Sequence, residues 1–427
     1  PAAGELPPGT TPDQPAGPGV APGADPGAPV APEDVAPENQ PAGDSAAGSC
    51  DGFANQTGIT DDTITLANAS DISGPVPGLF QAAQDGAAAF VAYFNATDDL
   101  CGRKLKLLEL DARSDAGGDQ QAYATVCDEA FGAIGSVSSQ DQGGAATAAA
   151  CGLPDVRSVS TTPQRNACGG CFAAYSQATS MVPSSLANFW LKSEKEASQH
   201  VAILYVNVEA ARVTAESYGR AYDKAGMNVD LVRGIDTGEF NFAPYVQEMK
   251  DKDIDFVQYF GPYQFALKLQ QAMEQQNFEP AVYLEDPILY DKNYTDQAGS
   301  AAEGVNVYSV LQLFDDAKIP EMVLYRQWLD QVAPGSIPNY FGLFAWSAAR
   351  LFVEEASKLG GRLSRSTLVS SLRKVRDWTS NGIHAPMPVG AKTTSRCIKI
   401  IQYNRGRWSQ VSPGDFMCGD LINTGGG

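Results

Sequence analysis

Short apolar runs alternate with long amphipathic segments along most of this 427-residue chain, and this alternation constrains its fold more than any other feature. The run at 63–69 (TITLANA) suits a strand. In the segment that follows, 78–95, aromatic and alanine residues recur every three or four positions, as in an amphipathic helix. Strands that alternate with such helices form parallel, doubly wound sheets. We therefore predict an α/β protein.

The remaining elements can be placed by the same periodicity. Further strands are predicted at 104–110, 133–137, 156–160, 201–206, 229–234, 256–260, 281–284 and 305–309. Helices are predicted at 120–131, 182–195, 211–225, 242–250 and 263–275, followed by a helical block at 320–331, 341–359 and 366–375. A hairpin, 397–403 and 408–411, follows this block. About ten strands approach the practical limit of one open sheet, so we expect two lobes.

The two lobes are expected to share the chain unevenly. The helical block after residue 318 is predicted to return to the first sheet, which assigns 58–178 plus 311–385 to lobe 1. Lobe 2 then comprises 179–310 plus 386–420. Residues 1–49 are rich in Pro, Ala and Gly and contain no aromatic residue, Lys or Arg, so they cannot offset their ordering entropy. We predict a disordered tether over 1–49 and a disordered tail over 421–427.

Charge and composition exclude several classes of function. The chain has 30 Lys and Arg against 50 Asp and Glu, a net charge of −20, which repels nucleic-acid phosphates and anionic lipid. No stretch approaches the roughly 18 consecutive apolar residues of a membrane helix. The two histidines, His200 and His384, and the absence of a GxSxG motif argue against a hydrolase or a His-rich metal site. We predict a protein that is not an enzyme and needs no metal or cofactor.

Eight cysteines outside any metal-type spacing indicate disulfides and an oxidising compartment. Scattered buried thiols are the alternative. The pairs expected from position are Cys50 with Cys101, Cys127 with Cys151, Cys168 with Cys171, and Cys397 with Cys418. The CGGC string at 168–171 also suggests thiol exchange, but a redox pair normally lies at a helix N-terminus, whereas this one is predicted in a loop after a strand.

Several strings resemble a known family when taken together. They are GITDDTIT at 58–65, SGP at 73–75, CGRKL at 101–105, DIDFV at 253–257 and AEGV at 302–305. Over about residues 58–411, their order and spacing resemble the type I periplasmic, or extracytoplasmic, solute-binding proteins of ATP-binding-cassette importers. The resemblance is to the leucine/isoleucine/valine-binding branch. It implies two lobes joined by a hinge of three crossings, with a small ligand in the cleft between them.

The resemblance also implies which residues contact the ligand. In the amino-acid-binding relatives a serine after the third strand and a threonine after the fourth hold the ligand carboxylate. Ser139 matches the serine, and Thr161 or Thr162 matches the threonine. Tyr263 matches an aromatic wall residue. Ser139 and Thr162 also suit ordinary helix caps, and Tyr263 also suits a packing role.

The second lobe is expected to supply an acid for a cationic group on the ligand. Glu285 and Asp286 occupy the corresponding loop, although both also suit a turn before a proline. Ser73 and Gln140, in the loops after the first and third strands, complete the expected contacts. The strings QDQ at 140–142 and YFGPY at 259–263 depart from the family pattern, so the solute class stays open among amino acids, amides and organic acids.

We therefore predict an extracytoplasmic protein that binds a small polar or amphipathic solute and delivers it to an ATP-binding-cassette permease. A ligand-sensing domain of a receptor system is the alternative. The tether suggests attachment to the outer face of the cell membrane through an N-terminal segment absent from this sequence. We expect a monomer.

Overall fold

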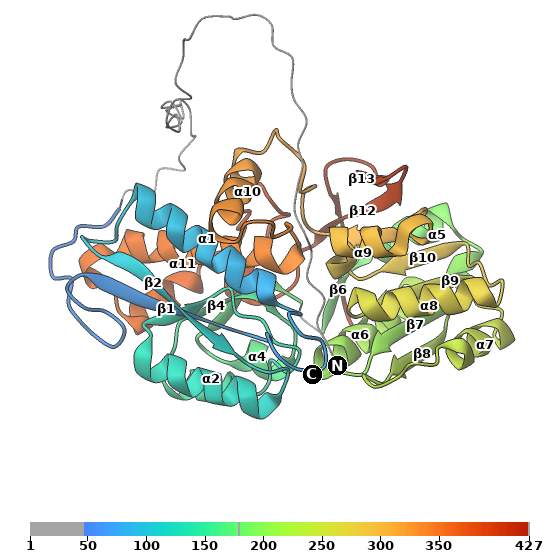
Figure 1. Cartoon of the computed structure of the whole chain (residues 1–427), viewed down its shortest axis with the longest axis horizontal. Helices are drawn as coiled ribbons and strands as arrows, with labels where there is room; N and C mark the ends of the chain where they lie inside the picture. The colour runs from blue at the N-terminus through green and yellow to red at the C-terminus, as the bar shows by residue number, and fades with distance from the viewer. Residues whose placement is uncertain (1–46, 178–179, 426–427) are drawn as a thin grey trace, which may run out of the picture. The chain divides into compact units, whose positions relative to one another are not determined.

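Two sheets with helices on both faces organise the computed structural model, which describes residues 47–177 and 180–425 (Figure 1). The first sheet is parallel, with strand order β2-β1-β3-β4-β5. Its strands are β1 (Thr63–Ser70), β2 (Lys104–Asp111), β3 (Gly132–Ile134), β4 (Asp155–Ser160) and β5 (Cys171–Ser176).

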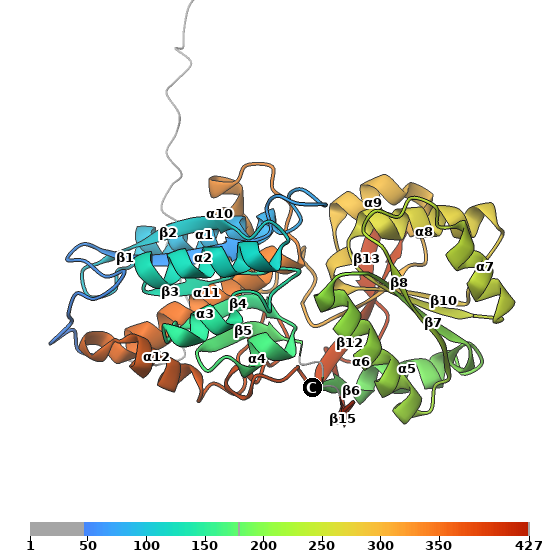
Figure 2. The same ribbon diagram turned by 90° about the horizontal axis from the view of Figure 1, so that it is seen from below.

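Helices cover both faces of this first sheet (Figure 2). Those on it are α1 (Gln81–Thr97), α2 (Ala116–Glu129), α3 (Ala145–Ala150), α4 (Pro163–Ala167), α10 (Pro320–Val332), α11 (Tyr340–Leu359) and α12 (Arg365–Leu372). Helices α1 and α11 can pack closely because Gly86 has no Cβ. A Cβ at this position would lie only 2.2 Å from the carbonyl oxygen of Gly342. Within the helical block after residue 318, α11 packs against β3, β4 and β5, while α10 packs on α1 and α12 on α11. We call this assembly lobe 1.

The second sheet has the order β13-β12-β11-β10-β9-β7-β8, with β14 also paired to β12. Its strands are β7 (Val201–Val206), β8 (Val229–Ile235), β9 (Phe256–Phe260), β10 (Val282–Glu285), β11 (Asn306–Ser309), β12 (Cys397–Asn404), β13 (Arg407–Gln410) and β14 (Met417–Cys418). The helices of this lobe 2 are α5 (Ser184–Ser193), α6 (Glu209–Ala225), α7 (Ala243–Asp251), α8 (Tyr263–Gln275) and α9 (Lys292–Ala298). Strand β12 runs antiparallel to β11 and β13, which confirms the predicted hairpin.

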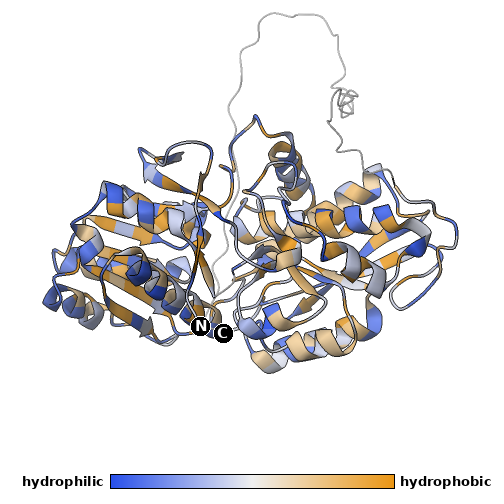
Figure 3. Ribbon diagram, turned by 180° about the vertical axis from the view of Figure 1, so that it is seen from behind, coloured by the Kyte–Doolittle hydropathy of each residue, from blue (hydrophilic) through white to orange (hydrophobic). Residues whose placement is uncertain are grey.

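Short 3₁₀ helices occur in the connections of both lobes. They are η1 (Ala197–Gln199), η2 (Pro287–Leu289), η3 (Gly299–Ala302), η4 (Gly360–Arg362) and η5 (Val389–Ala391). The chain passes between the lobes after β5, after β11 and before β12. Apolar residues concentrate on the strands and on the helix faces that cover them (Figure 3). None of the helices within 47–177 and 180–425 is long and apolar enough to cross a membrane.

The predicted disordered tail is wrong over residues 421–423. These residues form β15 (Leu421–Asn423), which pairs antiparallel with β6 (Met181–Pro183). Lys224 Nζ also donates a hydrogen bond to the Asn423 carbonyl at 2.7 Å. Edge pairing and these side-chain contacts offset the ordering entropy that the short polar sequence suggested.

The predicted tether falls mostly on residues 1–46, which lie outside the described residues. Its last residues contact lobe 1. The Gly48 N–H donates to the Ser357 carbonyl at 2.9 Å, and the Gly361 N–H donates to the Ser49 carbonyl at 2.7 Å.

All four expected disulfides are formed, and the described residues contain no free cysteine. Cys127 lies on α2, and Cys151 caps the C-terminus of α3. The pair at Cys168 and Cys171 differs in context, because it joins the end of α4 to the first residue of β5. Strand β5 was missing from the predicted elements.

Candidate functional site

A cavity of about 140 Å³ lies between the two lobes. Its walls come from the segments that follow the carboxyl ends of strands in both sheets, where parallel α/β sheets bind their ligands. On the lobe 1 side the wall includes Val76, Leu79, Ser138, Ser139, Thr161, Gln177, Tyr340 and Phe341. On the lobe 2 side it includes Val206, Val208, Ala210, Ala211, Thr214, Thr237, Pro262, Phe265, Asp286 and Ile288.

Ser139 lines this cavity as predicted, but its donors are already used within lobe 1. Its N–H and its hydroxyl both donate to Asp71 Oδ2, each at 2.8 Å. Asp71 immediately follows β1 and is completely buried, and its own carbonyl accepts from the Phe80 N–H at 3.1 Å. Asp71 therefore ties together the loops after β1 and β3.

A second buried acid, Asp141, fixes the loop after β4 in the same way. Asp141 Oδ2 accepts from the Thr161 N–H at 3.0 Å. Asp141 Oδ1 accepts from the Thr162 hydroxyl at 2.5 Å and from its N–H at 3.3 Å. Thr161 lines the cavity, whereas Thr162 is fully buried and caps α4 through the Arg165 N–H. For Thr162, the structure supports the capping role.

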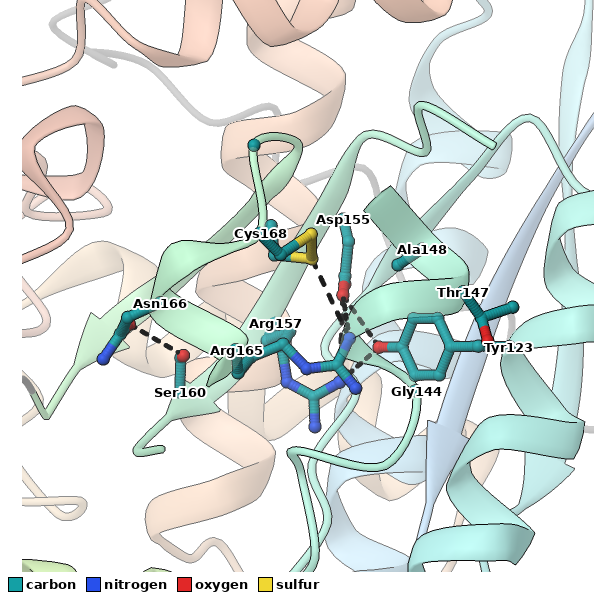
Figure 4. Close-up of a disulfide and its surroundings, with 12 residues drawn as sticks. Tyr123, Gly144, Thr147, Ala148, Asp155, Arg157, Ser160, Arg165, Asn166 and Cys168 are labelled. Carbon is teal, nitrogen blue, oxygen red and sulfur yellow. Dashed lines mark hydrogen bonds and ion pairs between the residues drawn. A yellow bond between two sulfur atoms is a disulfide. The ribbon is translucent and has the colours of Figure 1, made fainter. Parts of the chain in front are cut away.

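Behind this loop lies a cluster of buried charges, drawn in Figure 4 beside the disulfide of Cys168. Arg165 Nη2 contacts Asp119 Oδ2 at 2.8 Å, and Arg165 Nη1 lies 3.5 Å from Asp155 Oδ2. The side chains of Arg165, Asp119 and Asp155 are all fully buried. Arg165 Nε also donates to the Asp141 carbonyl at 2.7 Å. The cluster thus holds the loop that carries Thr161 from behind.

The lobe 2 wall is apolar except at a few positions, of which Asp286 is the charged one. Asp286 directly follows β10, is half-buried, and its Oδ1 accepts from the Ile288 N–H at 3.1 Å. No salt bridge reaches it from the described residues. Burial raises the pKa of Asp286 to about 7. Of the described residues that line the cavity, none is Lys, Arg or His.

Glu285 does not line the cavity. It is the last residue of β10, and it pairs in register with Tyr259 and Val307, whose side chains belong to the core under α7, α8 and α9. Successive residues of a strand face opposite sides, so Glu285 enters that core while Asp286 reaches the cavity. Burial raises the pKa of Glu285 well above its usual range.

Three further predicted contacts lie elsewhere. Ser73 is exposed, and its hydroxyl donates to Asp111 Oδ2 at 2.5 Å. The Gln140 side chain accepts from Gln142 Nε2 at 2.9 Å. Tyr263 lines an adjoining hollow with Asn293 and other residues, and its hydroxyl accepts from Gln297 Nε2 at 3.2 Å. None of the three is among the residues that line the cavity.

Sequence reasoning missed the aromatic and aliphatic wall of the cavity. Phe341 belongs to the first turn of α11, and Leu79 lies just before α1. Helical periodicity assigns both to packing, so the sequence carries no signal that separates them from core residues. Asp71 and Asp141 were missed as well, because their partners lie 68 and about 20 positions away in the chain.

A serine and a histidine do lie in hydrogen-bond contact, but they do not form a catalytic pair at the cavity. Ser347 Oγ lies 2.8 Å from His384 Nε2 and also accepts from Trp378 Nε1 at 2.8 Å. Both Ser347 and His384 are buried, and neither is among the lining residues. Burial lowers the pKa of His384 to about 4, which makes it a weak base.

Comparison with known proteins defines the class of this fold. A family model described as periplasmic binding protein matches residues 63–407. The chain therefore belongs to the periplasmic binding protein family, a family of substrate-binding proteins. No curated protein matches the sequence.

Solved structures share the fold at low sequence identity. The branched-chain amino acid transporter substrate-binding protein LivJ from Streptococcus pneumoniae, in complex with isoleucine, is 17% identical, with a TM-score of 0.69 over 82% of this chain and all of that one. A fatty acid ABC transporter substrate-binding protein from Thermomonospora curvata is 16% identical, with a TM-score of 0.73 over 88% and 96%. A solute-binding protein from R. palustris, in complex with 4-hydroxybenzoate, is 15% identical, with a TM-score of 0.70 over 83% and 98%.

Proposed function

We propose that this protein captures a small solute in the cavity between its lobes and delivers it to an ATP-binding-cassette permease. The observation that carries the proposal is the composition of the cavity. Both sheets contribute to its wall through segments at the carboxyl ends of their strands. A solute bound there contacts both lobes, so its binding favours the closed arrangement over the open one.

The character of the wall supports a solute with a substantial apolar part. The lining includes Leu79, Phe341, Val208 and Phe265, and its fewer polar groups come from both lobes. Small-molecule sites typically combine such an apolar lining with a few convergent polar groups. The structural neighbours named above are titled as binding proteins for isoleucine, 4-hydroxybenzoate or fatty acid, each of which has an apolar body.

The family and the disulfides support an extracytoplasmic location. Within the same proposal, residues 1–46 act as a spacer to an anchor on the outer face of the cell membrane, and the protein works as a monomer. Lobe 1 then corresponds to about 58–178 plus 311–385, and lobe 2 to 179–310 plus 386–420.

A thermal-shift screen of amino acids, amides, amines, aromatic acids and fatty acids tests solute binding, because a ligand raises the melting temperature according to its concentration relative to Kd. Ala211→Phe places a large side chain in the cavity and should abolish the shift. Ala146→Phe, at an exposed position on α3, is the matched control and should leave it unchanged. No shift with any compound would contradict solute binding.

Delivery needs a separate test. The loaded protein should stimulate ATP hydrolysis by its cognate ATP-binding-cassette permease, reconstituted in proteoliposomes, and Ala211→Phe should not. If solute binds but ATP hydrolysis does not respond, the transport part of the proposal is wrong and a sensing role takes its place.

A further inference from the structure

Three of the donor groups to which the resemblance assigns the ligand carboxylate are already occupied in this chain. The Ser139 N–H and hydroxyl donate to Asp71, and the Thr161 N–H donates to Asp141. Two carboxylates of the protein itself therefore take hydrogen bonds that would otherwise be offered to the solute. Both acids are almost completely buried.

These internal carboxylates also repel a carboxylate on the solute. A ligand carboxylate at Ser139 and Thr161 would have to compete for the same N–H groups and lie close to two buried acids. Two negatively charged carboxylates that lie close together repel each other strongly where water is excluded. The cavity offers no compensating cation, since none of its described lining residues is Lys, Arg or His.

The opposite wall is also electronegative. Asp286 faces the cavity without a salt-bridge partner among the described residues. The first turn of α6 contributes Ala210 and Ala211 to the wall, and its Glu209 carboxylate is paired with Arg212 at 2.9 Å. Asp286 is the only charged residue among the described residues that line the cavity.

We infer that the solute is an apolar amine without a carboxylate, whose ammonium group donates to Asp286 and whose hydrocarbon body packs against Leu79, Phe341 and Val208. The inference rests on the proposed function and names its class of solute. An uncharged alcohol or amide would leave the Asp286 carboxylate unpaired, whereas an ammonium group neutralises it. Burial has raised the pKa of this acid, and a bound ammonium opposes that shift.

Matched compounds with one hydrocarbon body test the inference. Phenethylamine, 2-phenylethanol and 3-phenylpropionate share the phenethyl body, phenylalanine adds a carboxylate to the amine, and hexylamine with hexanoate repeats the comparison without a ring. Titration calorimetry at pH 8 should show binding of the amines and at least about tenfold weaker binding of each carboxylate and of the alcohol.

Two variants locate the interaction. Asp286→Asn should weaken amine binding by about ten- to a hundredfold, because a charged hydrogen bond is replaced by a neutral one. Asp330→Asn, at an exposed acid on α10, lowers the overall charge equally and should leave the affinity unchanged. Circular dichroism and the melting temperature without ligand show that both variants are folded.

The possible outcomes distinguish failure of the inference from failure of the proposed function. Tighter binding of a carboxylate or of the alcohol than of its matched amine overturns the inference and leaves the proposed function intact. Equal amine affinity in the wild type and in Asp286→Asn also overturns it. If neither these compounds nor the wider screen shifts the melting temperature, the proposed function fails together with the inference.

Discussion

The two walls of the cavity use buried acids in opposite ways. In lobe 1, Asp71 Oδ2 and both carboxylate oxygens of Asp141 accept hydrogen bonds from N–H and hydroxyl donors. Behind them, Asp119 and Asp155 contact Arg165. In lobe 2, Glu285 and Asp286 are adjacent in sequence and form no salt bridge with any described residue.

This difference separates scaffolding from binding. A carboxylate that accepts several N–H groups fixes loop geometry and has little capacity left for a ligand. A partly buried carboxylate without a cation nearby is destabilised by the loss of its hydration, and a ligand with a positive charge offsets this destabilisation. Lobe 1 therefore supplies a rigid wall, and lobe 2 supplies the acid that responds to the solute.

Cross-links reinforce the same contrast. Three of the four disulfides lie in lobe 1, including the one beside the charge cluster, and the fourth joins β12 to β14 in lobe 2. The rigidity of lobe 1 can come from its charges or from its disulfides, whereas Asp286 in lobe 2 should behave as an unpaired acid.

Removal of Arg165 should have the largest effect on stability. Arg165→Met leaves Asp119 and Asp155 buried without this cation, and breaking a buried ion pair by removing one partner typically costs about 3–5 kcal/mol. Urea unfolding followed by circular dichroism measures the loss. Arg233→Met is the control, because Arg233 and its partner Glu248 are exposed, and such pairs contribute at most about 1 kcal/mol. Equal losses in the two variants would show that the cluster does not stabilise lobe 1.

Removal of disulfides should have smaller effects that depend on loop length. Replacing Cys127 and Cys151 by serine opens a loop with a sequence separation of 24, for which chain entropy predicts a loss of about 3 kcal/mol. Replacing Cys168 and Cys171 opens a separation of 3, for which the predicted loss is less than about 2 kcal/mol. A larger loss from the short disulfide, measured by the same unfolding curves, would mean that it, and not Arg165, holds the cluster together.

Much of the fold was predictable from local sequence, and the exceptions have physical causes. The helix α8 and the hairpin of β12 and β13 were predicted because their periodicity is strong. Strand β5 was missed because CFAAYS consists of small and aromatic residues, all buried, with no alternation to mark a strand. Strand β3 ends three residues earlier than predicted, because Gly135 adopts a φ of +67° and a Cβ there would lie 2.7 Å from Ala345 Cβ.

The site was predictable only in part. Ser139, Thr161 and Asp286 reach the cavity wall, since loops at the ends of parallel strands converge. The local sequence does not show which hydrogen-bond partner each side chain has in the folded protein. The hydrogen bonds donated to Asp71 and Asp141 link separate loops, and the opposite directions of Glu285 and Asp286 depend on the register of one strand.

The apolar wall should matter more for affinity than the predicted aromatic residue. Phe341→Ala removes a ring that lines the cavity and should weaken binding of any ligand from the screen by about tenfold or more, as expected for lost apolar burial. Tyr263→Ala should change the Kd by less than about threefold, because Tyr263 lines the adjoining hollow instead. Calorimetric titration of both variants decides this, and the reverse ranking would restore Tyr263 as the wall residue.

The smallest effect concerns the pH dependence of stability without ligand. Asp286 lies close enough to five buried tyrosines that its charge adds to the effect of burial in raising their pKa values; they are Tyr175, Tyr218, Tyr259, Tyr308 and Tyr340. No base among the described residues offsets that charge by a salt bridge, and the pKa of Asp286 is raised from 3.8 to about 7.

An acid whose pKa is raised by folding binds its proton more tightly in the folded state than in the unfolded state. The free energy of unfolding therefore falls as pH rises from about 4 to about 7. Glu285, with its raised pKa, contributes in the same direction, so the wild-type curve alone does not isolate the contribution of Asp286.

The Asp286→Asn variant isolates this contribution, because an amide stays neutral at every pH. Relative to the wild type, this variant should gain stability between pH 5 and pH 8 in paired urea titrations. A stability difference that stays constant over this range would mean that Asp286 is not held as an unpaired acid, and that the contrast between the two walls is wrong.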